Sequence, residues 1–78
     1  MPELTLYHFE GCPYCSYVRN YMGQKGIKIE EKDTMRQRGA REELIKIGGK
    51  GTVPCLVIDG QALYESPDIV SWFKKNWK

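Results

Sequence analysis

Alternation of apolar and polar side chains predicts the β-strands of this chain. Residues 3–7 (ELTLY) and 27–32 (IKIEEK) both alternate, which is the period of a half-buried strand. A later apolar run turns back through the dipeptide Asp59-Gly60, so residues 55–64 are predicted to form a β-hairpin. The pattern therefore predicts four strands.

Apolar side chains at intervals of three and four residues predict three helices. The first begins at Pro13 and ends at Gly26; Gly23 inside it costs about 1 kcal/mol relative to alanine, which suggests a packing reason. The second covers residues 35–49, and its apolar positions are Ala40, Leu44, Ile45 and Ile47. The third has Ser66 as its N-cap, followed by proline at the first helical position. Its inward face is predicted to consist of Ile69, Val70, Phe73 and Trp77.

The resulting element order is β-α-β-α-β-β-α. A strand–helix–strand unit with a right-handed crossover makes the first two strands parallel, and the hairpin adds an antiparallel pair. The helices must then cover both faces of a four-stranded mixed sheet. We therefore expect an α/β, thioredoxin-like fold, with residues 1–78 forming one domain.

Charge and composition disfavour several classes of protein. Twelve basic and ten acidic residues give a formal net charge of +2, and they are scattered, which disfavours nucleic-acid binding. No apolar run approaches the ~20 residues that a membrane span needs, and the first residues do not resemble a secretory signal. Three cysteines do not suit a secreted disulfide framework. We expect a cytoplasmic, monomeric protein with no nucleic-acid or membrane partner.

The motif CPYC places Cys12 and Cys15 where the first strand has ended and the first helix begins. A thiol at a helix N-terminus faces unpaired N–H groups and the positive end of the helix dipole, which both favour the thiolate. Cys15 lies one turn inside the helix, within reach of a disulfide, and is predicted to be the more buried. We expect Cys12 to attack and Cys15 to resolve the mixed disulfide.

Two other roles for Cys12 and Cys15 are disfavoured by the sequence. An inert structural disulfide does not suit a cytoplasmic chain, and a zinc site needs about four ligands, for which only Cys55 and His8 remain. A Cys-x-x-C pair that follows a strand and opens a helix instead favours redox chemistry. Cys55 is expected to be a small buried hydrophobic residue; the alternative is a third redox or cluster-binding thiol.

The segment TVPCLVI begins with a proline at a strand start, where the missing N–H is tolerated. If the bond before Pro54 were cis, the backbone N–H and C=O of Val53 would be free beside Cys12. An extended peptide could then pair with them in the manner of a strand.

With CPYC at 12–15, TVP at 52–54 and the run REELIKIGGKGTVP, the chain resembles a dithiol glutaredoxin over essentially its whole length. The resemblance implies reduction of disulfides by glutathione, with Cys12 as nucleophile and Cys15 as resolving thiol. It also implies a glutathione site formed by Tyr14 as a wall, Thr52 and Val53 as ligands, and Pro54 as the cis proline.

Two segments depart from the glutaredoxin pattern. The lysine common before the first cysteine is replaced by Phe9 and Glu10, and a carboxylate there would oppose ionisation of the thiol. The usual Gly-Gly segment with its acidic pair is replaced by LYESPDIVSWF, which resembles a glutathione transferase N-terminal domain. That resemblance implies Glu65 and Ser66 as glutathione ligands, although Ser66 could equally be a helix cap. Lys50 is either a contact for the glycine carboxylate or a solvated side chain.

The sequence therefore favours a glutathione-dependent thiol–disulfide oxidoreductase that reduces glutathione mixed disulfides and protein disulfides, with no metal. The alternative is an iron–sulfur cluster carrier, a dimer ligated by one cysteine per chain and by glutathione. A conjugating transferase is less favoured because no helical second domain follows, and a thioredoxin-type reductase because of the tyrosine in CPYC.

Overall fold

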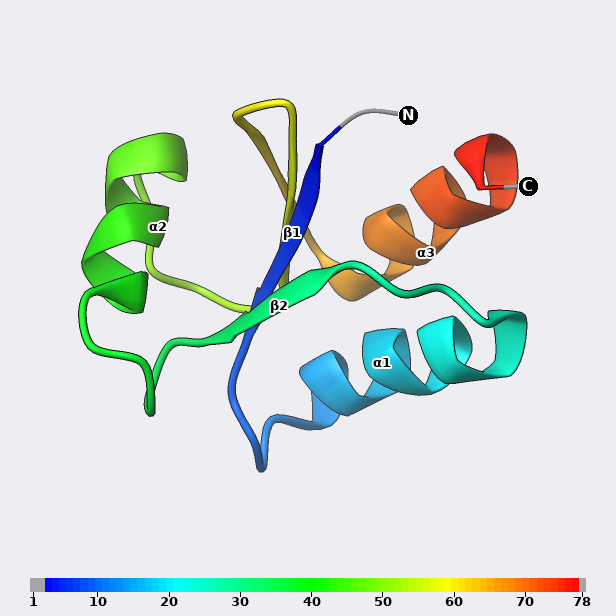
Figure 1. Ribbon diagram of the computed structural model, residues 1–78, viewed down its shortest axis with the longest axis horizontal. Helices are drawn as coiled ribbons and strands as arrows, with labels where there is room; N and C mark the ends of the chain where they lie inside the picture. Colours follow the sequence, from blue (N-terminus) through cyan, green and yellow to red (C-terminus); the bar gives the residue numbers. More distant parts are fainter. Residues whose placement is uncertain (1–2, 78) are drawn as a thin grey trace.

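The computed structural model describes residues 3–77 and contains the predicted elements in the predicted order. The strands are β1 (Leu4–His8), β2 (Glu30–Asp33), β3 (Cys55–Ile58) and β4 (Gln61–Tyr64), and the helices are α1 (Pro13–Lys25), α2 (Ala40–Gly48) and α3 (Ser66–Asn76). The sheet has the order β2-β1-β3-β4; β1 and β2 are parallel, and the other two pairs are antiparallel. The expected four-stranded mixed sheet of a thioredoxin-like fold is therefore confirmed (Figure 1).

Helices cover both faces of the sheet, with α1 and α3 on one side and α2 on the other (Figure 1). Alternation along β1 sends Leu6 into the core beneath α1 and α3 and sends Tyr7 into the core beneath α2. Both side chains are almost completely buried. The central strand is thus fixed from both sides, and it leads directly to the Cys-x-x-C motif.

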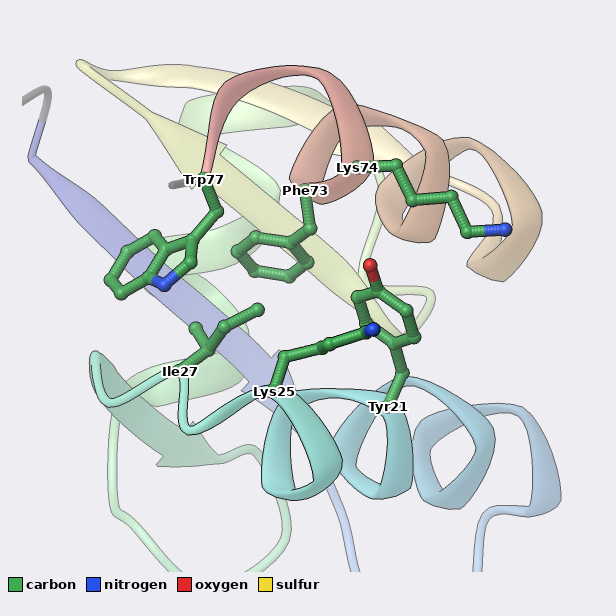
Figure 2. Close-up of a pocket in the computed structure, with 6 residues that line it drawn as sticks. All are labelled: Tyr21, Lys25, Ile27, Phe73, Lys74 and Trp77. Atoms are coloured by element: carbon green, nitrogen blue, oxygen red, sulfur yellow. The ribbon is translucent and has the colours of Figure 1, made fainter.

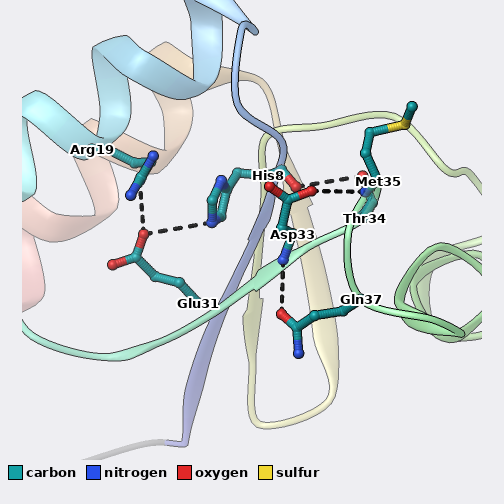
Figure 3. Close-up of polar contacts among 7 residues, drawn as sticks. All are labelled: His8, Arg19, Glu31, Asp33, Thr34, Met35 and Gln37. Carbon is teal, nitrogen blue, oxygen red and sulfur yellow. Dashed lines mark hydrogen bonds and ion pairs between the residues drawn. The ribbon is translucent and has the colours of Figure 1, made fainter.

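The second strand and the second helix begin later than predicted. Strand β2 starts at Glu30, although Ile27 is still buried in the core. Helix α2 starts at Ala40 because residues 33–37 form a turn. The Asp33 carboxylate accepts hydrogen bonds from the backbone N–H groups of Met35 and Arg36. The side-chain oxygen of Gln37 accepts the backbone N–H of Asp33 (Figure 3).

The apolar positions of α2 divide into two groups, and one prediction about α3 was wrong. Ile45 and Ile47 lie on the exposed side of α2, whereas Ala40 and Leu44 are buried. Ser66 is the first residue of α3 and not its N-cap; Glu65 occupies the cap position with a φ of 76° and makes no side-chain capping bond.

The remaining helical residues agree with their predicted roles. Ile69, Val70 and Phe73 are buried, and Trp77 caps the end of α3 while packing edge to face on Phe73 at 6.2 Å. No helix within residues 3–77 is long and apolar enough to cross a membrane.

Gly23 and Gly48 provide opposite tests of glycine inside a helix. A Cβ at Gly23 would meet no atom within 4 Å, so the packing reason suggested by the sequence is absent among the described residues. A Cβ at Gly48 would lie 2.8 Å from the Ala62 Cβ and would overlap the phenol ring of Tyr64. The close approach of β4 to α2 therefore requires glycine at position 48, whereas no neighbouring atom requires glycine at position 23 in α1.

We expect Gly23→Ala to raise the free energy of unfolding by about 0.5–1 kcal/mol, because alanine restricts the unfolded chain and favours the helix. Gly48→Ala should lower it, since Tyr64 and Ala62 would have to move. Urea unfolding followed by circular dichroism measures both changes. A Gly23→Ala variant no more stable than the wild type would contradict the account of position 23.

Candidate active site

Cys12 lies at the N-cap of α1, four residues after His8, the last residue of β1. Gly11, with a φ of 92°, turns the chain, and Pro13 occupies the first turn of the helix. The backbone N–H of Cys15 donates to the Cys12 Sγ at 3.4 Å. A hydrogen bond from a helix N-terminus stabilises negative charge on sulfur, so the position suits a thiolate nucleophile.

Cys15 is the more buried member of the pair. Its exposed fraction is 1%, against 7% for Cys12, and both thiols are free. Burial raises the pKa of the Cys15 thiol to about 12, and its hydrogen bond with Cys12 acts in the same direction. Cys15 is thus a neutral thiol at neutral pH, held one turn behind Cys12.

A cavity of about 430 Å³ lies beside the motif. It is lined from three parts of the chain: the start of α1, the loop before β3, and the junction of β4 with α3. All six residues predicted to bind glutathione line it, namely Tyr14, Thr52, Val53, Pro54, Glu65 and Ser66. The Val53–Pro54 peptide bond is cis, as the resemblance implied.

The floor of this cavity includes the start of α3. Ser66 is buried there, 6% exposed, and Pro67 follows it in the cavity wall. The first backbone N–H groups of a helix have no partner within the helix, and its dipole favours anions. This end of the cavity is therefore suited to a carboxylate.

Two further residues of the cavity, Tyr64 and Pro67, were missed, and Lys50 was left open. The Tyr64 hydroxyl donates to the Lys50 carbonyl at 2.9 Å, and the Lys50 ammonium lies 4.9 Å from the centre of the Tyr64 ring. The hairpin register pairs Tyr64 with Cys55, the residue after Pro54. Counting outward from the Asp59-Gly60 turn would have given that pairing from the sequence.

Cys55 itself is fully buried, as predicted, in the core between the sheet and α2. Burial raises the pKa of its thiol to about 11. Cys55 is not among the residues that line the cavity, although its hairpin partner Tyr64 is.

Glu10, which departs from the glutaredoxin pattern, forms an ion pair with Arg36 at 2.8 Å. Both side chains are largely exposed, so solvent screens the pair. The pair links the loop before Cys12 to the turn before α2.

His8, the other zinc ligand considered from the sequence, lies in a different set of contacts (Figure 3). Its Nε2 is 3.7 Å from the Glu31 carboxylate, which also accepts a hydrogen bond of 2.9 Å from Arg19. Burial, and then the positive charge of Arg19, lower the pKa of His8. Within the part of the chain that the structure describes, no three His, Cys, Asp or Glu side chains are grouped to hold a metal ion.

Comparison with known proteins agrees with this arrangement. Residues 6–77 match the family described as glutathione S-transferase, N-terminal domain. Glutaredoxin 3 of Escherichia coli K12 is 33% identical over 69 residues, which is 88% of this chain and 83% of that protein.

Solved structures lead to the same group of proteins. Glutathione transferase Omega 3C from Trametes versicolor has a TM-score of 0.79 and 28% identity, and glutaredoxin 2 from Salmonella typhimurium, in complex with glutathione, has 0.74 and 30%. They match 94% and 92% of this chain, which spans about a third (33%) of each. The chain therefore belongs to the glutaredoxin family and to the glutathione S-transferase N-terminal domain family, within the thioredoxin-like superfamily.

Proposed function

We propose that this protein is a glutathione-dependent thiol–disulfide oxidoreductase that reduces glutathione mixed disulfides and protein disulfides. The observation that carries the proposal is the cavity beside the CPYC motif, which Tyr14 of that motif lines and which gathers six residues expected to bind glutathione from three separate segments. Its glutaredoxin relatives support a thiol oxidoreductase, and the glutathione complex of glutaredoxin 2 supports the ligand.

In the first step, the Cys12 thiolate attacks the glutathione sulfur of a mixed disulfide. A bond forms between Cys12 Sγ and the glutathione sulfur, the original disulfide bond breaks, and the substrate leaves as a thiolate that takes a proton from water. A second glutathione thiolate then attacks the same glutathione sulfur. It releases Cys12 as thiolate and forms oxidised glutathione, so the net change is that one added glutathione thiol replaces the substrate thiol in the disulfide.

A protein disulfide follows a second route through Cys15. Cys12 first forms a mixed disulfide with the protein substrate, and Cys15 then attacks Cys12 Sγ as its thiol proton leaves. The substrate departs with both of its cysteines reduced, and the enzyme holds a Cys12–Cys15 disulfide. Two glutathione molecules return that disulfide to the dithiol and become oxidised glutathione.

The lining of the cavity suggests how glutathione is held. The backbone of Val53 pairs with the cysteine residue of the tripeptide as one strand pairs with another, with Thr52 beside it and Tyr14 as the wall. The N-terminus of α3 at Ser66 binds the γ-glutamyl carboxylate, and Glu65 binds the amino group of the same end. The sulfur of glutathione is thereby directed toward Cys12.

Free thiols and glutathione both belong to a reducing compartment, so we place the protein in the cytoplasm, where it acts as a monomer. The wild-type protein is expected to turn over a mixed disulfide of glutathione with 2-mercaptoethanol, coupled through glutathione reductase to oxidation of NADPH. Turnover should depend on glutathione and should stop when glutathione is replaced by a flavoprotein thioredoxin reductase. Folded protein that gives no glutathione-dependent turnover would overturn the proposal.

A further inference from the structure

Three tyrosines follow one side of α1 away from the active site. Tyr14, Tyr17 and Tyr21 are spaced by three and four residues, so they lie on neighbouring turns of the same helix side. Tyr14 and Tyr17 are 67% and 53% exposed, and Tyr21 is half-buried. Exposed aromatic side chains in a row are a feature of surfaces that bind other proteins.

The two ends of this row reach two different cavities. Tyr14 lines the cavity beside Cys12, together with Pro67 at the start of α3. Tyr21 lines a second cavity of about 480 Å³, together with Phe73 and Trp77 near the end of α3. Since α1 and α3 pack against each other in the same direction, the two cavities lie at opposite ends of the seam between these helices.

The second cavity has an apolar floor and a basic rim (Figure 2). Ile27, Phe73 and Trp77 provide the floor, and Phe73 is itself buried beneath the surface. Lys25 comes from the last turn of α1 and Lys74 from the last turn of α3. The cavity therefore offers an apolar area with the two ammonium groups on its Tyr21 side (Figure 2).

No acidic side chain lines this cavity, and within residues 3–77 neither lysine forms an ion pair. Lys46 and Lys75 likewise form no ion pair among the described residues, but they lie outside the cavity, so what distinguishes Lys25 and Lys74 is their place in its lining. The charge at the second cavity is thus complementary to carboxylates on a partner.

We propose that the row of tyrosines and the second cavity form a docking surface for the protein substrate. The partner is a polypeptide that carries an aromatic or aliphatic side chain with neighbouring acidic residues some distance from its reactive cysteine. This inference rests on the proposed function and adds a substrate class to it.

The dimensions of α1 determine that distance. The helix has 13 residues, which gives a length of about 20 Å at 1.5 Å per residue. An extended polypeptide covers that distance in about six residues. A small mixed disulfide bound at Cys12 does not reach the second cavity, so only substrates with a peptide chain gain from it.

Glutathionylated peptides test the docking surface. Both peptides carry one cysteine in a mixed disulfide with glutathione. The acidic peptide has the segment Phe-Glu-Glu about six residues before and about six residues after that cysteine, and the comparison peptide has Phe-Gln-Gln at the same positions. We expect the wild-type kcat/KM to be about fivefold higher for the acidic peptide through KM, since each exposed ion pair contributes little. The advantage should fall as salt is raised.

Matched variants locate the effect. Lys25→Gln/Lys74→Gln should reduce the advantage of the acidic peptide to less than about twofold. The control variant Lys46→Gln/Lys75→Gln removes the same amount of charge from the last turns of two helices, but outside the cavity. This variant should keep the full advantage of the acidic peptide. Neither pair should alter turnover of the 2-mercaptoethanol mixed disulfide.

The outcomes separate the two proposals. If the wild type turns over the small mixed disulfide but does not distinguish the two peptides, the docking surface is wrong and the proposed function stands. The docking surface is also wrong if Lys25→Gln/Lys74→Gln keeps the full preference, or if the control pair loses it equally. If the small mixed disulfide is not turned over, both proposals are wrong.

Discussion

Cys12→Ser is expected to abolish reduction of glutathione mixed disulfides, by at least about 10³-fold, whereas Cys15→Ser should retain turnover. Cys12 is the thiol at the helix N-terminus that accepts the Cys15 N–H, and serine is a far weaker nucleophile there. Cys15 is not needed when a second glutathione releases the enzyme from its mixed disulfide. The measurement is NADPH oxidation in the presence of glutathione and glutathione reductase.

Cys55→Ala is the matched control for these variants, because Cys55 is a buried thiol in the α2-side core. It should keep the activity, with a loss of stability typical of a small core truncation. Reduction of a protein disulfide should behave differently and should slow markedly in Cys15→Ser. The roles assigned to the pair would be wrong if Cys12→Ser kept measurable turnover or if Cys15→Ser, still folded, lost it.

The two helix N-termini explain why the site forms where it does. Helix α1 begins next to Cys12 and helix α3 begins at Ser66, and the cavity between them is bordered by residues of both. Each N-terminus presents unpaired N–H groups and a positive dipole end. In the proposed function, the first of these termini serves the attacking thiol and the second binds a carboxylate of glutathione, so a single arrangement would support both the chemistry and the binding.

The sequence predicted the order of the elements and the parallel and antiparallel pairing, because these follow from period, turns and crossover handedness. It placed the start of α2 too early. The apolar and basic pattern from residue 35 continues into the helix, but the Asp33 carboxylate binds the backbone of the residues that follow it and holds them in a turn. Hydrogen bonds of this kind, from a side chain to the nearby backbone, compete with helix formation. They cannot be read from the spacing of apolar and polar residues.

The sequence also predicted which residues gather around the cavity, but it did so through resemblance to known families. Tyr64 was missed because its place depends on pairing across the hairpin and on Gly48, which allows β4 to approach α2. Glu65 occupies the cap of α3 with a positive φ of 76°, which is uncommon for a residue other than glycine and could not be predicted from its residue type. Tertiary packing decides such positions.

Unfolding is expected to accelerate alkylation of Cys15 by about 10³-fold and of Cys55 by about 10²-fold, from ionisation alone. Only the thiolate reacts, and burial raises the pKa from its ordinary value of 9.0 to about 12 for Cys15 and about 11 for Cys55. At pH 7, about one Cys15 in 10⁵ is therefore ionised in the native protein, against about one in 10² in the unfolded chain.

The dependence on pH follows from the same shifts. Below about pH 9 the native and unfolded thiolate fractions both rise tenfold per pH unit, so the ratio of their rates stays constant. Above about pH 9 the unfolded thiols become fully ionised while the buried thiols continue to ionise, so the ratio falls. The native state binds more protons there, and its stability should decline as pH rises from 9 toward the folded-state values.

Iodoacetamide labelling of the reduced Cys12→Ser variant, followed by mass spectrometry of its peptides, measures Cys15 and Cys55 separately. Labelling in buffer and in denaturing urea at pH 7, 8 and 9 gives the two ratios and their pH dependence. A fast native rate at Cys55 would contradict its burial and would reopen a redox role for the third thiol. A fast native rate at Cys15 would mean that this thiol is ionised in the native protein, and it would contradict the account in which burial keeps the resolving thiol neutral.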